Sequence, residues 1–171
     1  MMLRLCLGLT LPILVGQTAP PAGWRQFTPK DGGFTVALPS VPTEKKRQAK
    51  SSNGTVEIAI YTCEPANDVI FVVGVTEYPN LETDGGEDKR LRNARDGALE
   101  NSKGKLIHER KITLAGHSGR ELWIQTEGDG MIHTRLYAVK QRLVQTMAIG
   151  PKESVETKAV AAFMDSLKLK K

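Results

Sequence analysis

The residues of this chain whose types could do chemistry are a serine in a short motif, three histidines and Cys63, one of two cysteines. Ser118 lies in Gly116-His117-Ser118-Gly119-Arg120, which approaches the G-x-S-x-G turn that presents a nucleophilic serine. Arg120 stands where that turn needs glycine, and the segment lies between two predicted strands, whereas the nucleophile turn joins a strand to a helix. A hairpin loop therefore explains the segment better than a nucleophile.

The histidines are not grouped as metal ligands. His108, His117 and His133 fall in or beside different predicted strands, whereas zinc needs three or four converging ligands. Three acids beside a glycine pair lack the calcium-loop pattern and suit the start of a helix; they are Asp84, Glu87 and Asp88. We expect no metal site, no cofactor and no catalytic residue.

One row of polar side chains is a candidate binding site. His133 and Arg135 share one face of a predicted strand, and Tyr137 lies beyond them on that face. Such a row could recognise an anion, although any solvated strand face shows the same alternation. We take His133, Arg135 and Tyr137 as candidate binding residues.

The first nineteen residues indicate where the protein works. Arg4 precedes an apolar run over 5–15, and small and polar residues follow, as in a secretory signal peptide. The run is shorter than the about 20 residues that span a bilayer. We expect a signal peptide over 1–19, cleaved between 16 and 22, and one extracytoplasmic domain over 20–171.

The two cysteines argue against a disulfide and a lipid anchor. Cys6 leaves with the leader and lies too early to be a lipidated cysteine. Cys63 is then single, so no internal disulfide is expected, and its apolar strand surroundings favour a core position over a nucleophile. We expect neither a membrane span nor a lipid anchor.

Composition and charge are those of an ordinary globular protein. Hydrophobic residues make up 40% and charged residues 25% of the chain, and the formal net charge is +5. The basic clusters at 45–47 and 168–171 are explained by solvated strand and tail charges. Because the basic residues are not interleaved with aromatics, nucleic-acid binding is not expected.

Alternating apolar residues and turn signals predict a chain rich in strands. Segments 24–27 and 34–38 form a first hairpin, and Asn53-Gly54, also a match to a glycosylation acceptor, joins 43–50 to 55–63. Segment 69–78 is apolar on both faces, which favours a central strand. Short connections predict an antiparallel meander over 106–114, 120–127, 131–140 and 142–149.

Helical spacing predicts two helices. One lies near 84–103, with Asp84 at its start and Gly104 just past its end. The other lies near 154–166, capped by Ser154, with an inward stripe of Val155, Ala159, Ala162 and Phe163. The fold is predicted to be α+β, with an antiparallel sheet of about seven or eight strands and two helices packed against it.

Four short motifs resemble one known fold. They are Gly-Phe-x-Val-x-Leu-Pro (33–39), Gly-Arg-Glu-Leu (119–122), Arg-x-Tyr (135–137) and Phe-x-x-Ser-Leu (163–167). With the order of elements, they resemble the PsbP-type fold of the extrinsic photosystem II protein, of the bacterial DcrB envelope lipoproteins and of many exported bacterial proteins. The resemblance implies a protein that binds or supports other proteins, and proteins of this fold have no common set of catalytic residues to carry over to this chain.

We therefore expect an exported, non-enzymatic accessory or binding module that engages a protein partner. One alternative is an enzyme assembled from dispersed residues, which a cleft with converging titratable groups of shifted pKa would favour. Another is a binder of a small ligand or envelope polymer at the face of His133, Arg135 and Tyr137. An apolar concave pocket would favour that binder, and a flat exposed apolar patch a protein partner.

Overall fold

The computed structural model describes residues 19–31, 33–51, 54–64, 68–79 and 86–170. Three expectations fall outside this part of the chain. They concern the signal peptide except for Ala19, the glycosylation acceptor at Asn53 and the helix start at Asp84.

Seven antiparallel strands form the main sheet, in the order β3-β4-β5-β9-β8-β7-β6. They are β3 (Thr43–Ser51), β4 (Gly54–Cys63), β5 (Ile70–Glu77), β6 (Lys105–Leu114), β7 (His117–Gln125), β8 (Gly130–Val139) and β9 (Arg142–Pro151). Each corresponds to a predicted strand, and the predicted α+β class with an antiparallel sheet is confirmed. As predicted, β5 is central, between β4 and β9.

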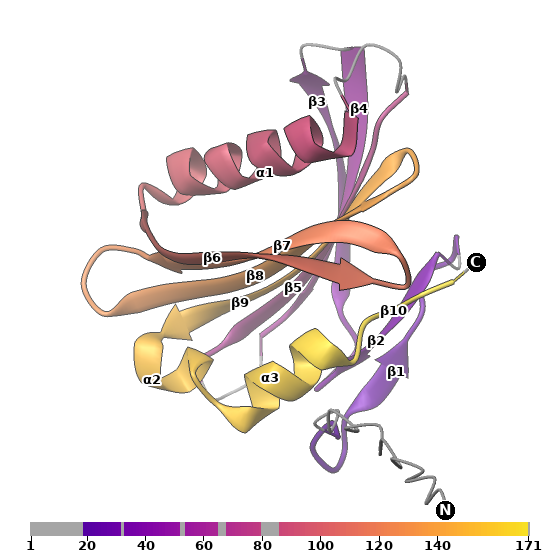
Figure 1. Ribbon diagram of the computed structural model, residues 1–171. Helices are drawn as coiled ribbons and strands as arrows, with labels where there is room; N and C mark the ends of the chain where they lie inside the picture. Colours follow the sequence, from indigo (N-terminus) through magenta and orange to yellow (C-terminus); the bar gives the residue numbers. More distant parts are fainter. Residues whose placement is uncertain (1–18, 32, 52–53, 65–67, 80–85, 171) are drawn as a thin grey trace, which may run out of the picture.

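A second sheet of three strands packs beside the main one, in the order β1-β2-β10 (Figure 1). β1 (Arg25–Phe27) and β2 (Phe34–Leu38) are the predicted first hairpin. β10 (Lys168–Leu169) pairs antiparallel with β2 and was not predicted. Two residues are too few to show a strand period, and long-range pairing with β2 forms this strand.

Helix α1 (Gly86–Ser102) covers one face of the main sheet and ends in a Schellman motif. The amide of Gly104 donates to the Leu99 carbonyl at 3.2 Å, and Lys103 takes the left-handed position with φ of 51°. A glycine does follow the helix, as predicted. Gly104 lies one residue after Lys103, which is the residue with the left-handed backbone conformation. A Cβ on Gly104 would meet Cγ2 of Ile124 at 2.4 Å, so close packing requires glycine there.

The predicted last helix is two helices, α2 (Lys152–Val155) and α3 (Lys158–Asp165). The expected cap at Ser154 is wrong, because extended Thr157 caps α3 and its hydroxyl accepts from the Val160 amide. The inward stripe is correct at Val155, Ala162 and Phe163, which are buried. A Thr hydroxyl that bonds to local backbone offers an alternative to helix continuation, which explains the break.

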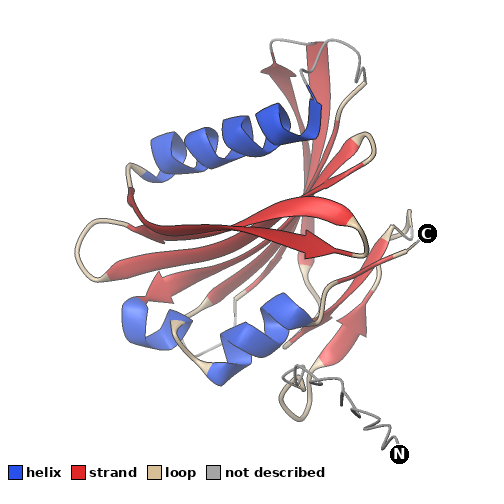
Figure 2. Cartoon of the chain, in the orientation of Figure 1, coloured by secondary structure: helices blue, strands red, loops and turns tan. Residues whose placement is uncertain are grey.

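The main sheet therefore has a layer on each face (Figure 2). On one face, α1 covers an apolar cluster that includes Leu91, Leu122 and Leu136. On the other, α2, α3 and the small sheet enclose the larger core, in which Phe71 packs edge-on against Phe163 at 5.0 Å between ring centroids. No helix in the described part of the chain is long and apolar enough to cross a membrane.

The hairpin between β6 and β7 is tighter than the predicted loop over 115–119. Ala115 and Gly116 both have positive φ, 51° and 83°, as a two-residue hairpin turn requires. His117 and Ser118 consequently belong to β7. The prediction that Ser118 belongs to a hairpin and not to a strand-to-helix turn is confirmed. The prediction that His117 lies in a loop is wrong.

Candidate functional site

The structure places His133, Arg135 and Tyr137 on one face of β8, as predicted, but it covers that face. His133 and Tyr137 retain only 5% and 4% of their surface, so the expectation of a solvated strand face is wrong. Gly119 lies opposite Tyr137 in β7, where a Cβ would meet the ring at 2.6 Å. A direct ligand-binding role of the row stays a prediction.

Buried Glu121 of β7 is the centre of the charges on this face. Its Oε1 accepts hydrogen bonds from Arg135 Nε at 2.6 Å and His133 Nε2 at 2.9 Å. Its Oε2 accepts from Arg110 of β6, and Arg135 Nη1 also reaches Asp165 of α3 at 2.7 Å. These five side chains, which we call the β7–β8 charge cluster, join three strands to α3.

The pairing decides the protonation of this cluster. Burial alone would raise the pKa of the Glu121 carboxyl, but hydrogen bonds from His133, Arg110 and Arg135 hold it well below its usual range. Burial would lower the pKa of Arg135, but its bonds to Glu121 and Asp165 raise it. Glu121 is thus a fully engaged carboxylate and not a proton donor or acceptor poised for chemistry.

His133 is held from two sides. Its ring stacks on Trp123 with centroids 3.9 Å apart and planes 13° from parallel. Because Nε2 faces a carboxylate, that nitrogen carries a proton, and Nδ1 is buried without a partner among the described residues. The surroundings fix the ring in place and leave it little contact with solvent.

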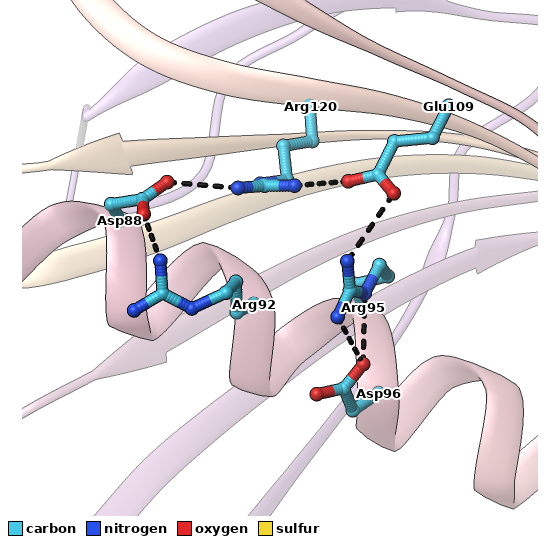
Figure 3. Close-up of polar contacts among 6 residues, drawn as sticks. All are labelled: Asp88, Arg92, Arg95, Asp96, Glu109 and Arg120. Carbon is cyan, nitrogen blue, oxygen red and sulfur yellow. Dashed lines mark hydrogen bonds and ion pairs between the residues drawn. The ribbon is translucent and has the colours of Figure 1, made fainter.

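A second chain of ion pairs connects α1 to the sheet (Figure 3). Arg120 of β7 bonds to Glu109 of β6 through Nη1 and to Asp88 of α1 through Nη2, the latter at 2.8 Å. Arg95, two turns further along α1, reaches the other oxygen of Glu109 at 3.3 Å. This α1–sheet network fixes the helix to the strands beneath it.

The open surface lies elsewhere, at the rim where the β1–β2 loop meets the main sheet. A first hollow of about 320 Å³ lies over β3, β4 and β5, beside Tyr61 and Glu57. A second hollow of about 770 Å³ adjoins it over β8 and β9. The hollows share Asp31 and Val75 in their linings.

One arginine of the second hollow bonds to two acids that line the first. Arg142 of β9 bonds to Asp31 of the β1–β2 loop at 3.0 Å and to Glu77 of β5 at 2.7 Å. In the first hollow, burial together with Glu44 raises the pKa of Tyr61 to about 12, and the hydroxyl donates to Glu44 at 3.2 Å. Tyr61 therefore stays protonated near neutral pH and acts there as a hydrogen-bond donor.

The structure also assigns places to the other candidate residues. Cys63 is buried, as predicted, and its thiol donates to the Ser40 carbonyl at 3.2 Å. Within the described ranges, no group of three or more His, Cys, Asp or Glu side chains is arranged to hold a metal ion. The exposed large apolar residues Val41, Ile70 and Ile107 lie on different parts of the fold.

Sequence reasoning missed Glu121 and Asp165, and it predicted neither hollow, although it had considered His117, which lines the second hollow. Glu121 stands in the Gly-Arg-Glu-Leu motif, where an acid among apolar neighbours is the signal that could have indicated a buried ion pair. The hollows collect residues from seven separate strands, from the β1–β2 loop and the β8–β9 turn, and from Lys170 near the C-terminus. These residues form no spacing pattern along the sequence that could have predicted the hollows.

Comparison with solved structures defines the class of fold. The chain matches the solution structure of cyanobacterial PsbP (CyanoP) from Synechocystis sp. PCC 6803 with a TM-score of 0.60 and 13% sequence identity, over 95% of this chain and 99% of that chain. The protein therefore has a PsbP-type fold, as the sequence motifs predicted.

A crystal structure of a protein of unknown function from Pseudomonas aeruginosa, described as a putative regulator, matches with a TM-score of 0.38 and 12% identity. The match covers 78% of this chain and 87% of that chain. No family model matches the sequence, and no curated protein shows significant similarity to it.

Proposed function

We propose that the protein is an exported, non-catalytic binding module that engages a protein partner along the free edge of β3. The observation that carries the proposal is the edge itself. Within the described ranges, β3 pairs only with β4, so the backbone groups along its other side have no partner strand in the main sheet. Such an edge is a template for an added strand from another chain.

The charge of β3 indicates the chemistry of that partner. Four exposed basic side chains stand on the strand, against one acid, Glu44; they are Lys45, Lys46, Arg47 and Lys50. Among the described residues, Lys46 alone of the four has an ion-pair partner, Glu44 at 3.5 Å. An extended segment rich in Asp and Glu would complement this edge through backbone hydrogen bonds and charge.

We propose that the protein is not an enzyme because its buried charged side chains pair with one another. The most buried ion pair of the described residues, His133–Glu121, belongs to the β7–β8 charge cluster, where Arg135 also pairs with Glu121. Catalysis needs a nucleophile, an acid–base pair or a metal presented to substrate. Purified protein should therefore show no hydrolysis of generic ester, peptide or phosphate substrates and no bound transition metal.

Export is tested separately from binding. A reporter fused to residues 1–22 should reach the extracytoplasmic side and lose its leader, because the charge, apolar length and exit residues are those of a signal peptide. A native protein that still begins at Met1 would contradict export. The proposed binding at β3 is tested independently by the peptide experiment.

The binding test uses a peptide of alternating Glu and Val, with Lys and Val in place of Glu and Val as the opposite-charge control. Wild-type protein should bind the acidic peptide, with affinity that falls as salt rises. The double change Lys45→Glu and Arg47→Glu should weaken binding about tenfold or more.

The matched control reverses Lys105 and Lys111 of β6, exposed bases on the opposite edge strand. Equal binding by the β3 and β6 variants would contradict the β3 site. If β3 charges serve only to prevent edge-to-edge association, the β3 variant will self-associate in sedimentation without any change in peptide affinity.

A further inference from the structure

The second hollow has the dimensions and floor of a ligand site. Its volume of about 770 Å³ lies within the roughly 300–1,000 Å³ typical of small-molecule pockets. Its floor is apolar and comes from the small sheet, β5, β8 and β9; it consists of Phe34, Val75, Val139 and Val144.

The rim above this floor is cationic. Lys140, Lys170 and Arg142 line it, with His117 at one side and Asp31 as the single acid. The two ion pairs of Arg142, to Asp31 and Glu77, offset its charge. Lys140 and Lys170 are exposed, and neither pairs with a described acid. The rim therefore has positive charge available to a ligand.

Hydrogen bonds to other parts of the fold hold the backbone of both lysines. Lys140 has a positive φ of 52° in the β8–β9 turn, and its carbonyl accepts from Arg90 Nη1 of α1 at 2.7 Å. The Lys170 amide donates to the Gly33 carbonyl at 3.1 Å, which holds the end of the chain against the start of β2. Figure 1 shows this turn and the C-terminus at the same end of the fold.

We propose that the second hollow binds an amphiphilic anion, a compact apolar chain or ring with one carboxylate or phosphate head. The apolar part would lie over Val139 and Val144, and the head would lie between Lys140 and Lys170. A cation would be repelled by this rim, and a small hydrophilic anion would leave the apolar floor unused. The site is separate from the β3 edge and does not depend on the proposed partner.

A fluorescent fatty acid, dansyl-labelled undecanoic acid, is the probe. Decanoate should displace it from the purified protein, and binding should tighten about fourfold per added methylene. Decanol lacks the head and acetate lacks the chain, so each should compete at least about tenfold more weakly. Equal competition by decanol and decanoate would contradict a role of the cationic rim in binding. The absence of any probe binding would contradict the proposed site.

Three variants locate the ligand. Lys140→Asn keeps a residue that tolerates positive φ, and together with Lys170→Gln it should weaken decanoate binding about 2- to 30-fold. Val139→Trp should cover the apolar floor with a bulky ring and abolish binding. The control is Lys152→Asn with Lys158→Gln, two exposed lysines outside the hollow. Unchanged affinity in the rim and floor variants, with unchanged circular dichroism, would overturn the assignment.

Phosphatidylglycerol vesicles distinguish a free amphiphile from a lipid as the source of the anion. Decanoate binding without sedimentation on vesicles identifies a free amphiphile. Sedimentation on vesicles that Val139→Trp abolishes identifies a lipid in the same hollow. Sedimentation that Val139→Trp leaves unchanged, with no decanoate binding, would overturn the proposal.

Discussion

Arg135 of β8 donates a hydrogen bond from Nη1 to Oδ1 of Asp165, 2.7 Å away at the end of α3. The same guanidinium holds Glu121 of the neighbouring strand through Nε. One side chain thus ties the last long helix to the main sheet. A residue expected to face a ligand instead connects two layers of the fold.

Removing the acid at the centre of this cluster should destabilise the protein. Glu121→Gln removes the carboxylate that pairs with His133 and Arg135 and leaves Arg135 only Asp165 as an anionic partner, and breaking a buried pair costs about 3–5 kcal/mol. We expect a value near the lower end, since the Arg135 side chain is 16% exposed. Urea denaturation should show this loss, and a change below about 1 kcal/mol would contradict a structural role.

The same carboxylate predicts acid sensitivity. The folded-state pKa of Glu121 is depressed below the ordinary value of 4.5, so its stabilising effect is complete at neutral pH and is lost as pH falls below that value. The thermal midpoint of wild type should drop from about pH 4.5 downward. Glu121→Gln should flatten that drop, and parallel pH profiles of the two proteins would contradict this assignment.

The docking of α3 depends on Phe163, which is fully buried against Phe71. Phe163→Ala should cost about 3–5 kcal/mol, because it removes a core aromatic and leaves a cavity. Lys158→Ala, at the exposed start of the same helix, should change stability by less than about 0.5 kcal/mol. Equal denaturation midpoints for the two variants would mean that the helix does not dock as described.

The α1–sheet network predicts a local effect. Arg120→Gln removes the links from β7 to Glu109 and Asp88, and loss of such charged hydrogen bonds costs about 1–3 kcal/mol. Amide hydrogen exchange should accelerate over 86–102 more than over 158–165. Arg92→Gln is the matched control, since Arg92 pairs with Asp88 on the helix itself. Equal acceleration by both variants would contradict an anchoring role for Arg120.

The sequence by itself determined the elements of this protein. Apolar alternation and turn signals together predicted the strands of the main sheet, with the segment of β3 as a polar edge strand, and the apolar run of β5 predicted a central strand. Helical spacing predicted α1 and most of the inward face of α2 and α3. Motifs made of core and turn residues sufficed to predict the PsbP-type fold, since those residues are the ones that a fold constrains.

Only the tertiary structure decided which polar residues are covered and which are open. His133, Arg135 and Tyr137 alternate as a solvated row would, yet the fold buries His133 and Tyr137 and pairs Arg135 with Glu121 and Asp165. Conversely, Lys140 and Lys170 look like ordinary surface charges until folding brings them over one apolar floor. The alternation of residues along a strand indicates which face of the strand a side chain is on. Only long-range packing decides which other elements cover that face.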